Sequence, residues 1–175
     1  MPDAMSHDDL NALHTEMATR ILNELKARHW TISSAESCTG GLFMGALTEI
    51  SGSSEIVSGG IICYSNEIKE EWVGVKAETL KQYGAVSEQT GHELAQGIRE
   101  RMKSTLGIGI TGIAGPGGGS AEKPVGLVYI GLATPDGVEV KRCQFDQDRS
   151  GNRARSVETA MQMVLDYCGK SDAEG

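Results

Sequence analysis

Apolar residues recur every three or four positions in three long segments of the chain, as they do on one face of a helix. The first segment predicts an amphipathic helix over 8–28, from Leu10, Leu13, Met17, Ile21 and Leu25. The same spacing predicts a helix that begins after Ser87, and a last helix over 150–167 that ends at Gly169. Shorter helices are predicted over 42–50, 67–73 and 77–83.

Apolar runs between these helices are typical of strands, and they lie over 30–35, 56–64, 106–113, 125–133 and 138–145. The last two runs flank Pro135-Asp136-Gly137, a strong turn signal, so they predict a β-hairpin and hence a mixed sheet. A chain of 175 residues has room for one core. We therefore expect a single three-layer α/β/α sandwich over 8–169, with tails over 1–7 and 170–175.

The composition argues against several classes of protein. A formal net charge of -8 argues against a nucleic-acid binder, because phosphate binding requires a concentrated basic surface. No apolar run approaches the roughly 18 residues of a membrane span, and the acidic start lacks signal-peptide features, so we expect a cytoplasmic protein. The four cysteines, at 38, 63, 143 and 168, lack metal-ligand spacing, and no metal site is predicted.

The stretch AESCTGG, residues 35–41, joins a predicted strand to a predicted helix, which is where α/β proteins usually bind ligands. Its serine, Ser37, has two interpretations: a nucleophile, or a side-chain cap of the helix, for which serine is favoured. Cys38 is a rival nucleophile, because a thiol at a helix start can have a lowered pKa. No histidine lies in a recognisable motif, so a Ser-His-Asp triad is not favoured.

Five stretches follow one another in a specific order: AESCTGG, GGIICYSNEIK (59–69), GAVS (84–87), TGIAGPGGG (111–119) and KPVG (123–126). Together they resemble the CinA C-terminal domain family, the nicotinamide-nucleotide amidohydrolases, over about 17–165 and in its stand-alone form. The resemblance implies hydrolysis of a linear carboxamide, that of nicotinamide mononucleotide, to nicotinic acid mononucleotide and ammonia in pyridine nucleotide salvage. It implies no metal and no cofactor.

The resemblance also implies catalytic residues, because Ser37 and Lys69 match the family's Ser/Lys pair and Tyr64 is expected to orient the lysine or relay a proton. Donors for the oxyanion are expected from the backbone of Thr39, Gly40 and Gly41. The residues alone leave other interpretations open. Lys69 also fits a solvated helix lysine paired with a neighbouring glutamate, and Tyr64 fits a buried core tyrosine.

Two further groups are candidates for binding substrate. The glycine-rich loop can present backbone N–H groups to a phosphate or carboxamide, and its candidates are Thr111, Gly112, Gly115 and Gly117; a tight connection between strands is the alternative. Arg149 and Arg153 lie four apart near the start of the last helix and can grip a phosphate, unless they are solvated surface residues. The family's G-D-R pattern appears here as Gln147-Asp148-Arg149. Because its glycine is replaced, the local backbone and hence the direction of the Arg149 side chain stay open.

Three classes of function remain in view from the sequence. The first is the metal-independent amidohydrolase, the second a non-catalytic nucleotide-binding or regulatory module linked to competence or DNA damage, and the third a Ser/Lys hydrolase of another amide. We favour the first, with a small-molecule substrate and without a nucleic-acid or membrane partner. A small enzyme commonly buries an apolar face between identical chains, so we also expect a homo-oligomer.

Overall fold

The structure is a computed structural model that describes residues 5–175. The expected N-terminal tail lies outside the described residues over 1–4, and a helix begins at His7 directly after its cap, Ser6. The elements are α1 (His7–Arg28), β1 (Ile32–Glu36), α2 (Leu42–Thr48), the 3-10 turn η1 (Ser53–Glu55), β2 (Val57–Ile62), α3 (Asn66–Ile68), the π-helical turn η2 (Lys69–Val73), α4 (Ala77–Tyr83), α5 (Glu88–Met102), β3 (Leu106–Gly112), β4 (Leu127–Thr134), β5 (Gly137–Gln144) and α6 (Arg149–Glu174).

The sheet has five strands in the order β2-β1-β3-β4-β5. β1 pairs in parallel with both β2 and β3, whereas β3–β4 and β4–β5 are antiparallel pairs. The predicted mixed sheet and hairpin are therefore confirmed. Because parallel strands end at the same edge of a sheet, the carboxyl ends of β1, β2 and β3 lie together there, which is the usual ligand-binding edge of an α/β fold.

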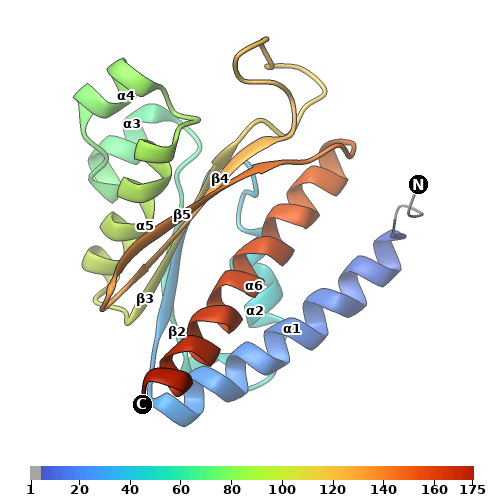
Figure 1. Ribbon diagram of the computed structural model, residues 1–175, viewed down its shortest axis with the longest axis vertical. Coiled ribbons are helices and arrows are strands. Elements are labelled where there is room, and N and C mark those ends of the chain that lie inside the picture. The colour runs from blue at the N-terminus through green and yellow to red at the C-terminus, as the bar shows by residue number, and fades with distance from the viewer. Residues whose placement is uncertain (1–4) are drawn as a thin grey trace.

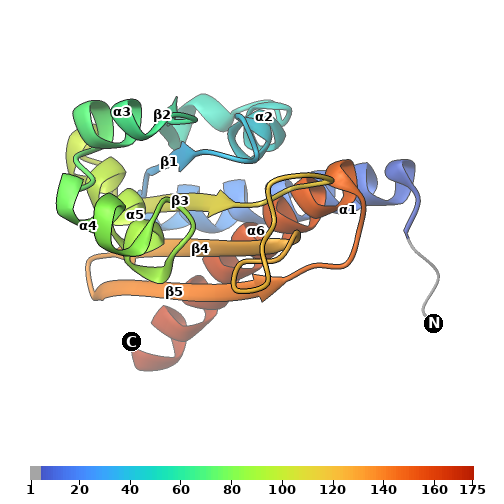
Figure 2. The ribbon, with the colours of Figure 1, turned by 90° about the horizontal axis from the view of Figure 1, so that it is seen from above.

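Helices cover both faces of the sheet and complete the predicted three layers. Figure 1 shows α1, α2 and α6 on one face and α3, α4 and α5 on the other. In the view from above, α6 and α1 run behind the strands while α4 and α5 lie in front (Figure 2).

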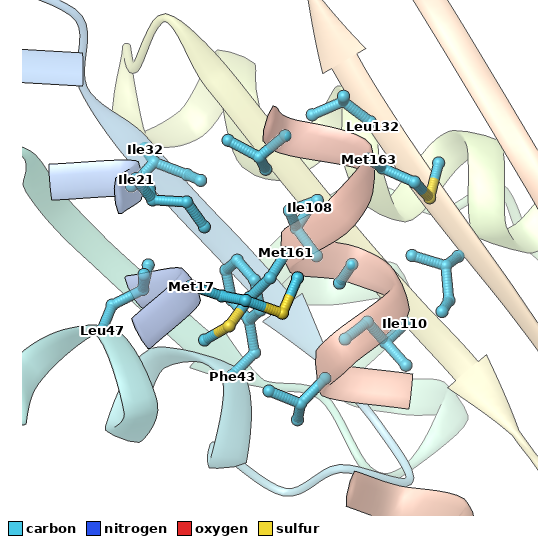
Figure 3. Close-up of a cluster of buried hydrophobic side chains, with 14 of the residues drawn as sticks. Met17, Ile21, Ile32, Phe43, Leu47, Ile108, Ile110, Leu132, Met161 and Met163 are labelled. Atoms are coloured by element: carbon cyan, nitrogen blue, oxygen red, sulfur yellow. The ribbon is translucent and has the colours of Figure 1, made fainter. Parts of the chain in front are cut away.

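The larger core fills the space between the sheet and the helices α1, α2 and α6. Its side chains come from every one of these elements, as Figure 3 shows for Met17, Phe43, Ile108 and Met161. A smaller cluster lies on the opposite face, where Leu94 and Ile98 of α5 pack against Ala35, Cys63 and Val73. Burial of apolar area on both faces stabilises the sheet and fixes the positions of its strand ends.

Glycines let α5 lie unusually close to the sheet. A Cβ atom at Gly109 would lie 2.5 Å from the backbone nitrogen of Ala95, and one at Gly131 would lie 2.5 Å from the carbonyl oxygen of Gly91. Both distances are far shorter than atoms in a packed core tolerate. The glycine pattern of the strands therefore sets the distance between the helix layer and the sheet.

Two predictions about helices need correction. The last helix does not stop at Gly169 but continues to Glu174, so the expected C-terminal tail is mostly helical. A single glycine in a helix costs only about 1 kcal/mol, and Arg28 of α1 holds the end of α6 by donating to the carbonyl oxygen of Cys168 at 3.2 Å. The predicted helix over 67–73 divides into α3 and the π-helical turn η2.

Replacing two glycines tests this packing. Gly131→Ala should lower the free energy of unfolding by about 1–3 kcal/mol, because the added methyl group overpacks the contact between β4 and α5. Gly169→Ala is the control, since its Cβ meets nothing within 4 Å; it should leave stability unchanged or raise it by up to about 1 kcal/mol. Urea unfolding followed by circular dichroism measures both, and equal stability of Gly131→Ala and the parent would contradict the close approach.

Candidate active site

Ser37 follows directly after β1, at the carboxyl edge of the parallel strands. Its backbone N–H donates to the carbonyl oxygen of Ile110 at 2.9 Å, which extends the pairing of β1 with β3 by one residue. Its side chain is 8% exposed. The sheet therefore fixes the backbone of Ser37 while leaving its hydroxyl at the wall of a pocket.

Lys69 reaches Ser37 from the start of the π-helical turn η2. Its Nζ donates to Ser37 Oγ at 3.1 Å, to the carbonyl oxygen of Cys63 at 2.8 Å and to that of Tyr64 at 3.0 Å. The lysine is 1% exposed, among the largest fully buried side chains of the described chain. π-Helical turns are rare and often occur at functional sites, and here the turn directs a lysine inward from a segment rich in glutamate.

Burial lowers the pKa of Lys69 below its ordinary value of 10.5, because an ammonium loses its hydration in this position. None of its three hydrogen-bond partners is a carboxylate. The alternative interpretation of Lys69 as a solvated lysine paired with a glutamate is therefore wrong. Burial therefore shifts Lys69 toward its neutral amine, which lies beside a hydroxyl group.

Ser37 does not cap the following helix. The N-cap of α2 is Gly41, at a φ of 100°, and it makes no side-chain cap hydrogen bond. The capping contacts come instead from Glu36, whose carboxylate accepts hydrogen bonds from the backbone N–H groups of Phe43 and Met44. Because Glu36 caps the helix, the Ser37 hydroxyl does not take part in capping and contacts Lys69 instead.

Cys38 does not have the properties of a nucleophile. It is buried, and desolvation raises the pKa of its thiol to about 11, although Arg153 and Lys69 oppose the shift. Because the thiolate is the reactive form, a thiol with such a pKa is inert near neutral pH. The short helix that follows does not lower it, so Ser37 is the better candidate.

A pocket of about 210 Å³ opens in front of the two residues, and we call it the Ser–Lys pocket. Its walls come from the ends of all three parallel strands and from the start of α6, and its lining side chains include Ser37, Lys69, Tyr64, Asn66, Thr111 and Arg149. Arg149 brings a guanidinium to its lining, and no Asp or Glu lines it. That guanidinium favours a ligand with negative charge.

The binding candidates differ in how they are held. Thr111 is buried and its Oγ1 donates to the carbonyl oxygen of Ala85 at 2.7 Å. Arg149 donates to the carbonyl oxygen of Gly115 at 2.7 Å and to Tyr64 Oη at 3.4 Å. Tyr64 is 63% exposed, so its interpretation as a core residue is wrong. Its carbonyl oxygen, rather than its ring, contacts Lys69.

Several expected site residues lie elsewhere. Gly40 uses its N–H in a turn, donating to the carbonyl oxygen of Ser37 at 3.1 Å. Thr39 is fully buried outside the pocket lining, and Gly40, Gly41 and Arg153 line a different groove between α1, α2 and α6. Gly117 is exposed and, like Gly115, is not part of the lining.

Arg153 holds the turn that follows Ser37 and does not line the Ser–Lys pocket. Its Nε donates to the carbonyl oxygen of Cys38 at 3.0 Å and its Nη2 to that of Thr39 at 3.2 Å. Its spacing from Arg149 along α6 is as expected, but the two side chains serve different surfaces. Residues four apart share a helix face, but here the two guanidinium groups do not reach the same site.

Four residues of the pocket lining were missed from the sequence. They are Asn66, Ala85, Val86 and Ala114, and Asn66 lies in the same YSNEIK stretch as Lys69. The position of Asn66 three residues before Lys69 was a usable signal, because both belong to one turn.

Among residues 5–175, no group of three or more His, Cys, Asp or Glu side chains is arranged to hold a metal ion. None of the helices in the described chain combines the length and apolar character that a membrane crossing requires.

Comparison with known proteins assigns the chain to a family. The sequence model of the CinA C-terminal domain matches residues 14–168. The chain belongs to the CinA C-terminal domain family. Among CinA relatives, the nicotinamide-nucleotide amidohydrolase PncC of Enterobacter agglomerans is 46% identical over 151 residues, covering 86% of this chain and 92% of that protein.

Longer relatives contain this domain as one part. A putative competence-damage inducible protein of Caldanaerobacter subterraneus subsp. tengcongensis is 47% identical over 152 residues, which are 87% of this chain but 37% of that protein. The chain thus spans little more than a third of the length of such relatives. The crystal structure of the competence/damage inducible protein CihA from Agrobacterium tumefaciens shares the fold, with a TM-score of 0.85 and 44% identity over 87% of this chain and 94% of that one.

The buried lysine should make stability depend on pH in a recognisable way. At pH values between its lowered folded pKa and 10.5, the unfolded chain binds a proton on Lys69 that the folded chain does not. Rising pH therefore stabilises the folded state in this window, by up to about 1.4 kcal/mol per pH unit. Lys69→Met removes this contribution, so the stability advantage of the parent over the variant should grow with pH.

Urea unfolding of the parent and of Lys69→Met at pH 7, 8, 9 and 10 measures this difference directly. Lys81→Met, a change of an exposed helix lysine, is the matched control, and its difference from the parent should stay constant. A constant difference for Lys69→Met as well would show that Lys69 keeps its proton in the folded state across this range.

Proposed function

We propose that this chain hydrolyses the carboxamide of nicotinamide mononucleotide to nicotinic acid mononucleotide and ammonia, with Ser37 as nucleophile and Lys69 as its base. The main support is one contact, the 3.1 Å approach of a buried lysine Nζ to a serine Oγ at the wall of a pocket. The name of the Enterobacter agglomerans relative supports the substrate class. The cationic lining of the pocket suits a nucleotide phosphate.

The hydrogen bonds of Lys69 suit it to act as a base. A neutral amine has two N–H donors and one lone pair, and the carbonyl oxygens of Cys63 and Tyr64 accept two donors. In this neutral form the 3.1 Å contact with Ser37 reverses, so that the serine hydroxyl donates and the amine lone pair accepts. Two backbone carbonyls thus orient the base, and burial lowers its pKa.

The reaction proceeds in two halves. Ser37 Oγ forms a bond to the carboxamide carbon while its proton passes to Lys69 Nζ, which leaves a tetrahedral oxyanion. As this collapses, the C–N bond breaks and Lys69 returns the proton to the departing nitrogen, so that ammonia leaves and Ser37 carries the acyl group. Water then attacks the ester with Lys69 again as base, releasing the carboxylic acid and restoring the serine hydroxyl.

The remaining lining residues stabilise and position the substrate. Cys38 follows the nucleophile and lines the pocket, so its backbone N–H is our candidate oxyanion donor in place of Gly40, and the Asn66 amide is a second. Arg149, at the rim, binds the phosphate, and Tyr64 Oη supports that guanidinium. Thr111 fixes the GAVS loop that forms the opposite wall.

Ammonia release from nicotinamide mononucleotide tests this proposal. Ser37→Ala and Lys69→Ala should each lower kcat by about 10³-fold or more, because the two residues act as one unit. Cys38→Ala is the matched control, since it removes the neighbouring side chain but keeps the backbone, and it should retain kcat within about tenfold. The assay is run with a chelator, with folding of each variant checked by circular dichroism.

The other outcomes identify the rival functions. Turnover that survives Ser37→Ala but not Cys38→Ala would assign the chemistry to the thiol. Binding of the nucleotide without turnover in the parent would favour the regulatory module, and turnover of other carboxamides in preference to nicotinamide mononucleotide would favour a hydrolase with another substrate.

The pH profile of kcat/KM provides an independent check. Lys69 must be neutral to accept the proton, so kcat/KM should rise with pH along a limb whose midpoint lies below 10.5. Initial rates from pH 5 to 10 in buffers of constant ionic strength measure this limb. A profile that falls over the whole range would contradict a basic role for Lys69.

A further inference from the structure

Glu36, the last residue of β1, has an unusual environment for a carboxylate. It is 1% exposed, and its two oxygens accept four hydrogen bonds from the chain. Oε1 accepts from Thr39 Oγ1 at 2.7 Å and from the backbone N–H of Phe43 at 2.9 Å. Oε2 accepts from Ser34 Oγ at 3.1 Å and from the backbone N–H of Met44 at 3.1 Å.

None of these four partners carries a positive charge, so polar donors alone compensate the buried carboxylate. Burying a charged group is costly unless it is fully hydrogen-bonded. A neutral side chain such as serine or asparagine at the N-cap would satisfy the same helix N–H groups without that cost. The arrangement therefore needs a reason beyond capping a helix of seven residues.

A hydrogen bond between the Glu36 and Thr39 side chains spans the turn that contains Ser37. Glu36 precedes Ser37 and Thr39 follows it by two residues, so the 2.7 Å hydrogen bond between their side chains fixes the turn on which the serine lies. From the other side, Arg153 donates to the carbonyl oxygens of Cys38 and Thr39. The Glu36 carboxylate accepts from this turn and the Arg153 guanidinium donates to it, so the turn has little freedom to shift.

We propose that Glu36 is a positioning residue, which holds Ser37 Oγ within reach of Lys69 by fixing the 36–39 turn to the start of α2. The inference rests on the proposed function, because it assumes that Ser37 is the nucleophile. A displacement of the nucleophile by about 1 Å is enough to cost roughly 100-fold in rate. Glu36 does not line the Ser–Lys pocket, and none of its side-chain hydrogen bonds is to Lys69.

Glu36→Gln is the sharpest test because it keeps the shape of the side chain. All four partners of Glu36 donate, so the new NH₂ group must face at least one donor and the turn must move. We expect kcat to fall by about 30–1,000-fold with KM within about threefold of the parent. The midpoint of the pH limb set by Lys69 should stay in place, because the variant changes the position of Ser37 rather than the base.

A second measurement does not depend on the natural substrate. A fluorophosphonate reacts covalently with activated serines, and intact-mass spectrometry gives the rate at which Ser37 is labelled. Glu36→Gln should slow this labelling by a factor similar to its effect on kcat. Thr39→Val removes only the 2.7 Å contact and should produce a smaller effect in the same direction, about 3–30-fold, which keeps the test available if Glu36→Gln fails to fold.

Ser104→Ala controls for the loss of any buried hydrogen bond. Ser104 Oγ contacts Ser33 Oγ at 2.6 Å near the opposite end of β1, away from the pocket. This variant should lower the free energy of unfolding while keeping kcat and the labelling rate within about twofold per folded molecule. It separates a general loss of stability from a displacement of the nucleophile.

The outcomes separate the two proposals. Folded Glu36→Gln and Thr39→Val proteins that label and turn over as fast as the parent would overturn the role of Glu36 and leave the amidase intact. A parent that is labelled at Ser37 but releases no ammonia would overturn the proposed substrate, while slower labelling of Glu36→Gln would still support the positioning role. A parent that is neither labelled nor active would overturn both.

Discussion

The site depends on one buried contact, the approach of a lysine whose pKa is lowered by burial to a serine across the ends of two parallel strands. Lys69 follows β2 and Ser37 follows β1, so their meeting requires that these strands pair in parallel and in register. The N–H of Cys63 donates to the carbonyl oxygen of Glu36 at 2.9 Å and continues that pairing to the edge. The Cys63 carbonyl oxygen then accepts from Lys69, so the sheet itself sets the position of the base.

The rest of the fold makes this contact possible by excluding water from it. Helix α5 lies close against the sheet because glycines face it, and its side chains Leu94 and Ile98 pack against Cys63 and Val73, beside the lysine. Ile110 supplies the carbonyl oxygen that holds the Ser37 backbone, and its own side chain belongs to the core on the other face. Packing that serves stability thus also lowers the pKa of Lys69.

Local sequence predicted most elements because hydrophobic period and turn residues are local properties, as with Pro135-Asp136-Gly137 and the helix after Ser87. The Ser37–Lys69 pair required the family motifs, since two residues separated by a strand and a helix reveal no contact in local sequence. Arg153 was misjudged, and Glu36 was not considered, for a related reason. Whether a charged residue faces solvent, substrate or backbone depends on how three separate segments pack, and the spacing of Arg149 and Arg153 on α6 carries no such information.

The raised pKa of the Cys38 thiol, beside the proposed nucleophile, has a consequence for the conditions under which the site can operate. With a pKa of about 11, only about one thiol in ten thousand is ionised at pH 7. Peroxides and disulfides react with thiolates, so this cysteine is protected from oxidation by its burial. An amidase built on a serine next to such a cysteine should keep working under oxidative stress, when enzymes that depend on a reactive thiolate are inactivated.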